Sequence, residues 1–275
     1  MGNIGWNFRG KTVVITGSSG GIGRETALRF ARAGASLAIC DLDPAGGLET
    51  AQQCLQAGAA HASFYHMDVG CDASVVKAGE NILNDFGCVD ILFSNAGIFP
   101  RYMGPPLNSI PDLEWERVFS INTLGMVRVC RTFAPAMKER RQGKIVLTSS
   151  ISMNMPNPAT MPYSASKIAT ANFAQAFSLE MGPYNVNVNV VCPGYVFTGI
   201  YANGTGMRFK ERRSNAFSDC SDDRSVMNKM ASTSALGRPQ GAEDIANAVM
   251  FLCSDEASEI TGQIINVDSG MIRRY

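Results

Sequence analysis

Residues 12–23 read Thr-Val-Val-Ile-Thr-Gly-Ser-Ser-Gly-Gly-Ile-Gly, which joins an apolar run to a glycine-rich turn. The run from Thr12 to Thr16 predicts a buried β-strand, and the stretch Gly21–Ala33 predicts a helix that Gly34 ends. Glycines permit a sharp turn here, and the free N–H groups and dipole of a helix N-terminus favour the negative charge of a pyrophosphate. The segment therefore predicts a βα unit that binds a dinucleotide.

Short β-branched runs and helix-length amphipathic stretches alternate along the rest of the chain. Near-continuous apolar strands separated by helices are typical of a parallel sheet covered on both faces, and right-handed crossovers make such a sheet doubly wound. We therefore expect an α/β fold, a Rossmann-type doubly wound parallel sheet flanked by helices, in a single domain over residues 1–275. The further strands expected are Ser36–Cys40, Ala62–Met67, Val89–Ser94, Gly143–Ser149, Val186–Val191 and Gln263–Val267. The further helices expected are one that ends near Ala57, then Ala73–Phe86, Pro111–Met137, Tyr163–Met181 and Ala242–Leu252.

An acidic residue stands where the second strand ends. Asp41 follows Gly23 by eighteen residues, a position from which a carboxylate can accept hydrogen bonds from the adenosine ribose hydroxyls. Its charge would repel a 2′-phosphate, and Ser18, Ser19 and Leu42 offer no cation to bind one. NAD is therefore favoured over NADP as the cofactor.

A second group of polar residues spans 150–167, where Ser150 ends an apolar run and Tyr163 precedes Lys167 by four residues. If a helix begins near Tyr163, Tyr163 and Lys167 lie on one face, a turn apart. A phenol titrates near about 10, and a neighbouring ammonium is expected to pull the tyrosine pKa toward neutrality. Tyr163 is then a candidate acid/base for an alcohol or ketone, with Ser150 as a hydroxyl donor to the same oxygen. Taken alone the trio is weak evidence, because a polar loop followed by a helix with an exposed lysine contains the same residues.

The composition argues against several classes of protein. The chain has 275 residues with 45% hydrophobic and 17% charged residues and no net charge, so we expect no nucleic-acid or membrane partner. The eight cysteines are spread singly, no secretory signal is present and no apolar run could span a bilayer. The only histidines, His61 and His66, belong to no cluster with metal-site spacing, so no metal is expected. These features predict a soluble, cytoplasmic protein with reduced cysteines.

The glycine turn also matches a hydrolase motif. Residues 17–21 fit the pattern G-x-S-x-G of a nucleophile elbow, which needs an acid and then a histidine later in the chain. The last histidine is His66, far too early for that order. The hydrolase interpretation therefore fails.

Taken together, these motifs resemble the short-chain dehydrogenase/reductase family, in its NAD-dependent form of about 250 residues. The resemblance runs from about residue 8 to residue 270. It rests on Thr16–Gly23, Asn95-Ala96-Gly97, Asn122, Ser150, Tyr163 with Lys167, Pro193–Thr198, Gly237-Arg238-Pro239, Phe251–Asp255, Thr261-Gly262 and Val267–Gly270.

The resemblance implies an oxidoreductase that interconverts a secondary alcohol and a ketone, with Tyr163 as the acid/base and Ser150 on the substrate oxygen. Lys167 would support the phenolate and bind the nicotinamide ribose, and Asn122 would hold a water in a proton relay. For Asn122 an exposed polar residue of a helix is the alternative. The cofactor contacts implied are Gly17, Ser19, Gly21, Ile22, Gly23, Asp41, Leu42, Asp68, Val69, Asn95, Ala96, Gly97, Tyr163, Lys167, Pro193, Gly194, Val196 and Thr198.

A long, poorly periodic insertion follows the last of these motifs, and we expect a substrate lid over about residues 195–235. Its apolar side chains fit either a hydrophobic pocket or plain core filling. The first alternative predicts a hydrophobic or cyclic alcohol or ketone as the small-molecule substrate.

Family members commonly form tetramers or dimers, so the resemblance also implies a homo-oligomer, with a tetramer favoured, that pairs through Pro111–Met137 and Tyr163–Met181. A different class of function remains open, an NAD(H)-binding regulatory or scaffold protein with little turnover. The intact trio of Ser150, Tyr163 and Lys167 favours the enzyme.

The chain departs from the family pattern at two positions. Asn187 stands where the family usually has arginine, in an unusually polar strand, and Ser269 replaces a usual glycine. The second change could alter the C-terminal turn.

Overall fold

The computed structural model describes residues 5–101, 106–198 and 217–273 of the chain. Its centre is a parallel sheet of seven strands in the order β3-β2-β1-β4-β5-β6-β7, which confirms the predicted fold class. The strands are β1 (Thr12–Thr16), β2 (Ser36–Asp41), β3 (His61–His66), β4 (Ile91–Ser94), β5 (Gly143–Thr148), β6 (Val186–Pro193) and β7 (Ile264–Val267). The longer helices are α1 (Gly21–Arg32), α2 (Pro44–Ala57), α3 (Asp72–Phe86), α4 (Asp112–Phe119), α5 (Gly125–Arg140), α6 (Met161–Met181), α9 (Asp223–Ala231) and α10 (Ala242–Cys253).

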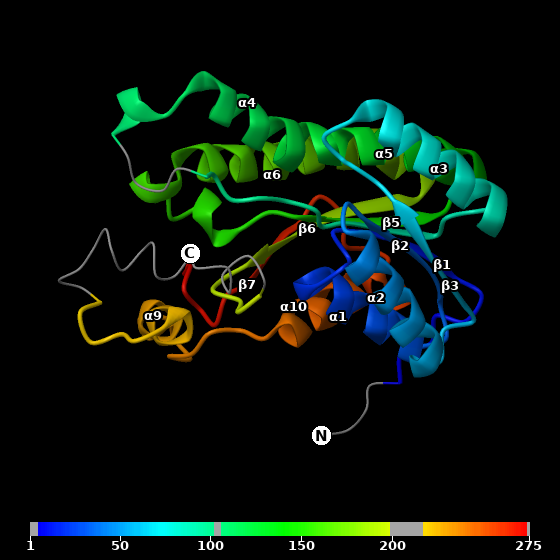
Figure 1. Cartoon of the computed structure of the whole chain (residues 1–275). Helices are drawn as coiled ribbons and strands as arrows, with labels where there is room; N and C mark the ends of the chain where they lie inside the picture. Colours follow the sequence, from blue (N-terminus) through cyan, green and yellow to red (C-terminus); the bar gives the residue numbers. More distant parts are fainter. Residues whose placement is uncertain (1–4, 102–105, 199–216, 274–275) are drawn as a thin grey trace.

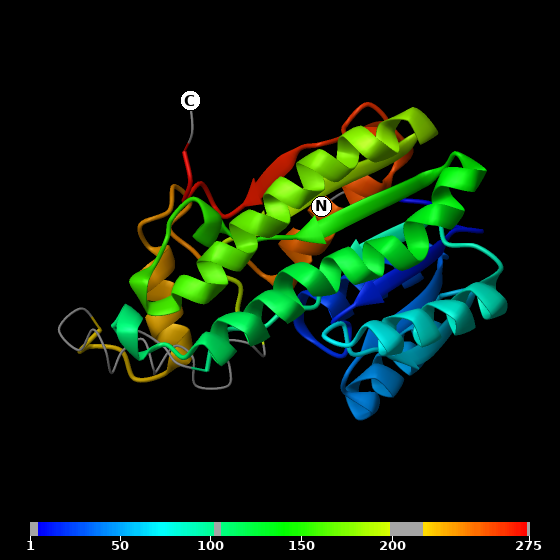
Figure 2. The same ribbon diagram turned by 90° about the horizontal axis from the view of Figure 1, so that it is seen from above.

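Two layers of helices cover the sheet. Figure 1 shows α1, α2 and α10 below it and α3 to α6 above it. Figure 2 looks down on the upper layer, where α6 lies beside the helical run from α4 to α5. Side chains of one strand enter both layers in turn: Val14 packs in the core under α3 and α5, and Val13 and Ile15 pack in the core over α1 and α10. Burial on both faces is why the strands are apolar almost without interruption.

The order of the strands creates an opening at one edge of the sheet. β1 pairs with β2 on one side and with β4 on the other, so the crossovers on its two sides wind in opposite directions. In open α/β sheets ligands bind beyond the carboxyl ends of the strands at this point. The turn after β1, which holds the predicted glycines, and the segment after β4 therefore face the same crevice.

The helix expected over Pro111–Met137 is interrupted and runs further, to Arg140. Between α4 and α5 lies a π-helical turn, η2 (Ser120–Leu124), that the sequence pattern does not reveal. Its side chains bond outside the helix: Thr123 Oγ1 donates to the Ser166 carbonyl at 3.1 Å. Asn122 is likewise bonded outside it, as described below. The wide turn is held by these contacts with neighbouring elements, and a single-helix prediction could not include them.

The insertion expected as a lid contains a helix that the prediction missed. In α9, Asp222 accepts a hydrogen bond from the Ser225 N–H at 2.7 Å, and the Ser225 hydroxyl accepts one from the Asp222 N–H at 3.1 Å. This reciprocal cap starts a helix whose Val226 and Met227 are buried. The part of the expected lid over residues 199–216 lies outside the described residues.

The two departures from the family pattern have structural roles. Asn187 Nδ2 donates to the carbonyls of Ser258 and Ile260 at 2.8 and 3.1 Å, and its Oδ1 accepts from Lys144 Nζ at 2.7 Å. These bonds account for a polar side chain on β6. Ser269 has a φ of 57°, a left-handed conformation that glycine adopts without strain.

Candidate active site

A cavity of about 390 Å³ opens at the carboxyl ends of the strands. Every predicted site residue except Gly23 and Asn122 lies on its wall. The lining comprises Gly17, Ser19, Gly20, Gly21, Ile22, Asp41, Leu42, Met67, Asp68, Val69, Asn95, Ala96, Gly97, Ile98, Phe99, Ile121, Thr148, Ser149, Ser150, Tyr163, Lys167, Pro193, Gly194, Val196 and Thr198.

Three glycines of the turn, Gly17, Gly21 and Gly23, lie too close to neighbouring atoms to carry a side chain without displacement. A Cβ atom on Gly17, which has a φ of +66°, would lie 2.8 Å from Ala96 Cα. A Cβ on Gly21 would lie 3.1 Å from Thr198 Cβ, and one on Gly23 would lie 2.1 Å from the Gly17 carbonyl oxygen. Gly23 is therefore a packing residue that lets α1 start directly against the turn, which explains its absence from the cavity wall.

Asn95 joins the turn after β1 to the segment after β4. Its Nδ2 donates to the carbonyls of Thr16 and Gly17 at 3.2 and 3.1 Å. In return, Thr16 Oγ1 accepts from the N–H groups of Asn95 and Ala96 at 3.0 and 3.1 Å. These four bonds fix the two sides of the crevice relative to each other.

Asp41 lies at one end of the cavity, fixed by two backbone donors. Its Oδ2 accepts from the Ser19 N–H at 2.8 Å, and its Oδ1 accepts from the Asp43 N–H at 3.0 Å. These two bonds fix the position of the carboxylate beside the glycine turn. Its place on the wall agrees with the sequence-based position for an adenosine ribose.

The other end of the cavity holds Tyr163, Lys167 and Ser150. Tyr163 and Lys167 lie a turn apart on α6, and Lys167 Nζ is 5.6 Å from the centre of the Tyr163 ring. Lys167 is only 2% exposed, and its Nζ donates to the Thr148 carbonyl at 2.9 Å. Ser150 is the second residue after the end of β5 and forms a hydrogen bond with Tyr163. The structure thus brings the predicted trio together.

Burial, rather than the lysine charge, dominates the titration of this end. It raises the pKa of Tyr163 to about 12, although the hydrogen bond with Ser150 acts in the opposite direction. Burial also lowers the pKa of Lys167 from its ordinary 10.5 to about 8. The expected shift of the tyrosine pKa toward neutrality is therefore absent from the protein without cofactor, because desolvation disfavours both charged forms.

The lowered pKa of Lys167 makes stability depend on pH. Between pH 8 and pH 10 the unfolded chain keeps this lysine protonated while the folded chain releases the proton, so the unfolded state binds more protons. The free energy of unfolding of the wild type should therefore rise across this window relative to that of Lys167→Met. Urea unfolding of both proteins at several pH values checks this. A difference between them that stays flat from pH 8 to 10 would rule out a buried lysine with a lowered pKa.

Asn122 lies behind the cavity wall. Its Nδ2 donates to the Ile98 carbonyl at 3.0 Å and to Ser166 Oγ at 3.1 Å, and its Oδ1 accepts from the Ile98 N–H at 2.8 Å. Its own carbonyl accepts from Thr170 Oγ1 at 3.1 Å. These bonds hold the segment after β4 beside Lys167. The structure therefore shows a buried positioning role in place of an exposed polar residue, and the water relay stays a prediction.

The prediction missed several lining residues, of which Phe99 is the most informative. Its ring centre lies 4.3 Å from that of Tyr163, and Arg117 Nη2 donates to its carbonyl at 3.1 Å. Arg117 in turn pairs with the buried Glu114 at 2.8 Å. The signal was available, since Ile98-Phe99 directly follows the predicted Asn95-Ala96-Gly97. The other missed residues on the wall are Gly20, Met67, Ile98, Ile121, Thr148 and Ser149.

These features fit a nicotinamide dinucleotide. At the glycine turn the backbone can approach a ligand closely, because the glycines carry no side chains. The Asp41 carboxylate lies at one end of the cavity and the buried Lys167 ammonium at the other. A Cβ on Gly97 would lie 3.3 Å from Lys167 Nζ, so the wall beside the lysine is also bare backbone. Pro193, Gly194, Val196 and Thr198 complete the wall on the side of β6.

The described parts of the chain hold neither a metal-binding cluster nor a membrane-spanning helix. Among those residues, no three His, Cys, Asp or Glu side chains gather in a way that could hold a metal ion. No helix in residues 5–101, 106–198 and 217–273 has the length and apolar character needed to cross a membrane.

Comparisons with known proteins agree with this geometry. A family model described as enoyl-(acyl carrier protein) reductase matches residues 17–272. The chain is 33% identical over 265 residues to 3-oxoacyl-(acyl-carrier-protein) reductase FabG of Escherichia coli, covering 96% of this chain and 98% of that protein. It is 30% identical over 267 residues to secoisolariciresinol dehydrogenase of Forsythia intermedia, covering 97% and 91%. The crystal structure of NAD⁺-bound xylitol dehydrogenase superposes with a TM-score of 0.84 at 28% identity, covering 96% of this chain and 99% of that one. The chain therefore belongs to the short-chain dehydrogenase/reductase family, whose members are oxidoreductases that use nicotinamide cofactors.

Proposed function

We propose that this protein is an NAD(H)-dependent oxidoreductase that interconverts a secondary alcohol and a ketone, with Tyr163 as the acid/base. One observation carries the proposal: a single cavity has Asp41 at one end and the trio of Ser150, Tyr163 and Lys167 at the other. A regulatory dinucleotide sensor has no use for such a trio.

The mechanism follows from the positions of these side chains. When bound, the nicotinamide ring supplies the site that accepts or gives the hydride. In oxidation, Tyr163 as phenolate takes the proton of the alcohol while the carbinol carbon loses its hydride and becomes a carbonyl. Ser150 donates a hydrogen bond to the same oxygen and steadies its developing charge. Lys167, one turn along α6, favours the phenolate by its positive charge, and reduction follows the same path in reverse.

The preference for NAD over NADP rests on Asp41. Its carboxylate accepts from two backbone N–H groups and lines the cavity, so a 2′-phosphate beside it would meet a fixed negative charge. Lys167, at the opposite end, is the one Lys or Arg among the described residues that line this cavity. The similarity to an NAD⁺-bound xylitol dehydrogenase is consistent with this choice.

The substrate is proposed to be hydrophobic or cyclic. Ile98 and Phe99 present apolar surface next to Tyr163, and the Phe99 ring packs on the tyrosine itself. We place the catalytic unit in one domain over residues 1–275, with a substrate lid over about 195–235. In the described part of that lid, Phe217, Cys220 and Val226 form an apolar cluster of their own. A segment with its own core can move as a unit over the cavity.

We also propose a homo-oligomer, with a tetramer favoured over a dimer. Large apolar side chains on the outer helical layer are exposed: Leu113 of α4 by 77%, Ile168 of α6 by 52% and Leu179 of α6 by 79%. A second copy that packs on this layer would bury them. Light scattering of the purified protein gives its mass in solution, which distinguishes a tetramer from a dimer and from a monomer.

The proposed function is tested by following NADH formation with a panel of secondary alcohols, hydrophobic, cyclic and polyhydroxylated. NAD and NADP are compared at equal concentration. We expect turnover of hydrophobic or cyclic alcohols with a kcat/KM at least about tenfold higher for NAD than for NADP. If the protein binds NADH but neither oxidises any of the alcohols nor reduces any of the matching ketones, a regulatory protein is favoured. A higher kcat/KM with NADP would contradict the cofactor assignment.

A further inference from the structure

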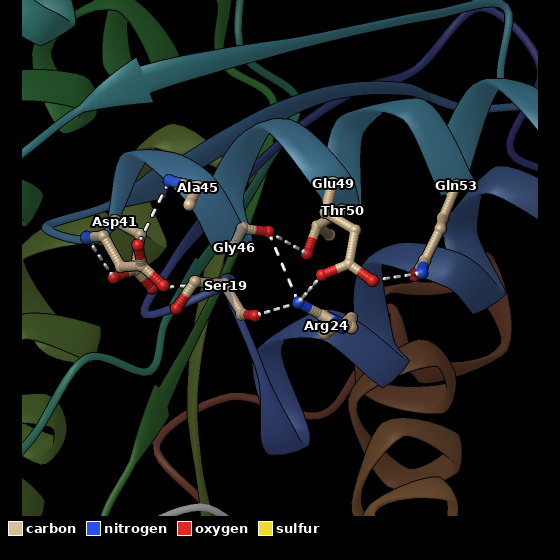
Figure 3. A network of polar contacts seen from close by, with 9 residues as sticks. Ser19, Arg24, Asp41, Ala45, Gly46, Glu49, Thr50 and Gln53 are labelled. Atoms are coloured by element: carbon tan, nitrogen blue, oxygen red, sulfur yellow. Dashed lines mark hydrogen bonds and ion pairs between the residues drawn. The ribbon is translucent and has the colours of Figure 1, made fainter.

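Arg24 stands directly behind the cavity wall at its Asp41 end. Figure 3 shows its guanidinium between the start of α1 and the first turns of α2. Its Nη2 donates to the Ser19 carbonyl at 2.5 Å, to the Gly46 carbonyl at 3.4 Å and to Glu49 Oε2 at 3.0 Å. Both backbone polar groups of Ser19 are therefore hydrogen-bonded: its carbonyl accepts from Arg24 and its N–H donates to Asp41. Ser19 therefore stands between the Asp41 carboxylate, at the acidic end of the cavity, and the Arg24 guanidinium.

Negative charge predominates around the Asp41 end of the cavity. Asp41 at the end of β2 and Asp43 at the N-cap of α2 carry negative charge, and Glu49 within α2 adds a third carboxylate. Of these three carboxylates, Arg24 pairs with Glu49, at 3.0 Å, and this ion pair neutralises the guanidinium charge. Moreover, Arg24 Nε is buried with no hydrogen-bond acceptor among the described residues. The guanidinium therefore retains donor capacity that its present contacts do not use.

Arginine is the side chain best suited to a phosphate, because it carries a permanent charge and several donors. Here the arginine nearest in sequence to the glycine turn is held by a carboxylate and two carbonyls instead. A 2′-phosphate that entered next to Asp41 would find Arg24 already neutralised. Removing the charge of Asp41 alone would leave that neutralisation in place.

We propose that Glu49 is a second determinant of cofactor choice, which excludes the 2′-phosphate of NADP by keeping Arg24 paired and behind Ser19. The inference rests on the proposed function, because it assumes that the adenosine ribose lies at Asp41. It assigns to Glu49, a residue that does not line the cavity, part of the selectivity otherwise attributed to Asp41.

The test measures binding of NADH and NADPH by fluorescence titration to the purified protein, which requires no substrate. Four variants are compared with the wild type: Asp41→Ser, Glu49→Gln, the double variant, and the double variant with Arg24→Met. We expect Asp41→Ser to raise NADPH affinity about tenfold and the double variant to raise it about tenfold beyond the product of the two single effects. Arg24→Met should abolish that additional gain.

A matched control separates the release of Arg24 from a general loss of negative charge. Glu25 in α1 pairs with Arg29 at 2.9 Å and does not contact Arg24 in any described hydrogen bond or ion pair. Asp41→Ser combined with Glu25→Gln removes the same two charges and should bind NADPH no better than Asp41→Ser. Thermal unfolding of every variant confirms that each is folded before titration.

The outcomes distinguish the two proposals. Purely multiplicative effects of Asp41→Ser and Glu49→Gln, or a gain that survives Arg24→Met, overturn the role of Glu49 and leave the proposed function intact. A wild type that binds NADPH more tightly than NADH overturns both the NAD assignment and this inference. A wild type that binds NADH and turns over no substrate overturns the proposed function, and the titrations still decide the role of Glu49.

Discussion

Replacing Tyr163 with phenylalanine should lower kcat about 1,000-fold, within the usual range for the loss of a general acid/base. Phenylalanine keeps the ring that packs on Phe99 at 4.3 Å, so the shape of the cavity is retained. The change removes only the hydroxyl that exchanges the proton with the substrate oxygen. NADH affinity should therefore change by less than about threefold. Steady-state kinetics with the best alcohol, together with NADH titration, measure both quantities.

The matched control for this variant is Tyr184→Phe. Tyr184 lies in the short helix after α6, next to Lys138 and Arg141, and does not line the cavity. The same chemical change there should leave kcat as in the wild type. If Tyr163→Phe retained the wild-type rate, the assignment of the acid/base to Tyr163 would be wrong, whatever the cofactor.

A second large effect is expected for Gly17→Ala. Its φ of +66° is unfavourable for alanine, and the new Cβ would lie 2.8 Å from Ala96 Cα, a backbone atom that cannot rotate away. Strain and overpacking together should lower the free energy of unfolding by about 2–4 kcal/mol. Relief of the overlap with Ala96 would move the two sides of the crevice apart. NADH affinity should therefore fall about 100-fold. Urea unfolding and NADH titration measure the two losses.

Gly10→Ala separates strain from overpacking. Gly10 has a φ of +75°, close to that of Gly17, but a Cβ there would meet no atom within 4 Å. This variant should lose only about 1 kcal/mol of stability and no NADH affinity. Equal stability losses in Gly10→Ala and Gly17→Ala would show that the contact with Ala96 is unimportant.

The fold and most of the site could be predicted because both depend on local signals. The run Thr12–Thr16 and the glycines after it specify a strand, a turn and a helix within one short segment. Tyr163 and Lys167 share a helix, so their four-residue spacing alone placed them on one face. Residues that follow successive parallel strands meet at one edge of the sheet, which is why Asp41 and Asn95 lie on one cavity.

The remainder depends on contacts between distant segments, which spacing does not report. Arg24 looks like an ordinary exposed helix residue in the sequence, and its role follows only from the approach of α2. The high pKa of Tyr163 follows from burial by the surrounding elements, whereas the sequence showed only the nearby lysine. The cap of α9 was visible as Asp222 and Ser225, but the weak periodicity around it concealed the helix.

The π-helical turn between α4 and α5 corrects the rotation of the helix that contains it. Glu114, Val118, Asn122 and Met126 follow one another at four-residue intervals, and all four are buried. In an uninterrupted α-helix each such step advances about 40°, so three steps would rotate the last side chain about 120° from the first. The wider turn of residues 120–124 absorbs this drift, which lets one end of the helix hold the loop beside Phe99 while the other end packs on the sheet. Deleting a single residue there would shift the helical phase by about 100° and turn Asn122 away from Ile98, without altering any residue of the catalytic trio.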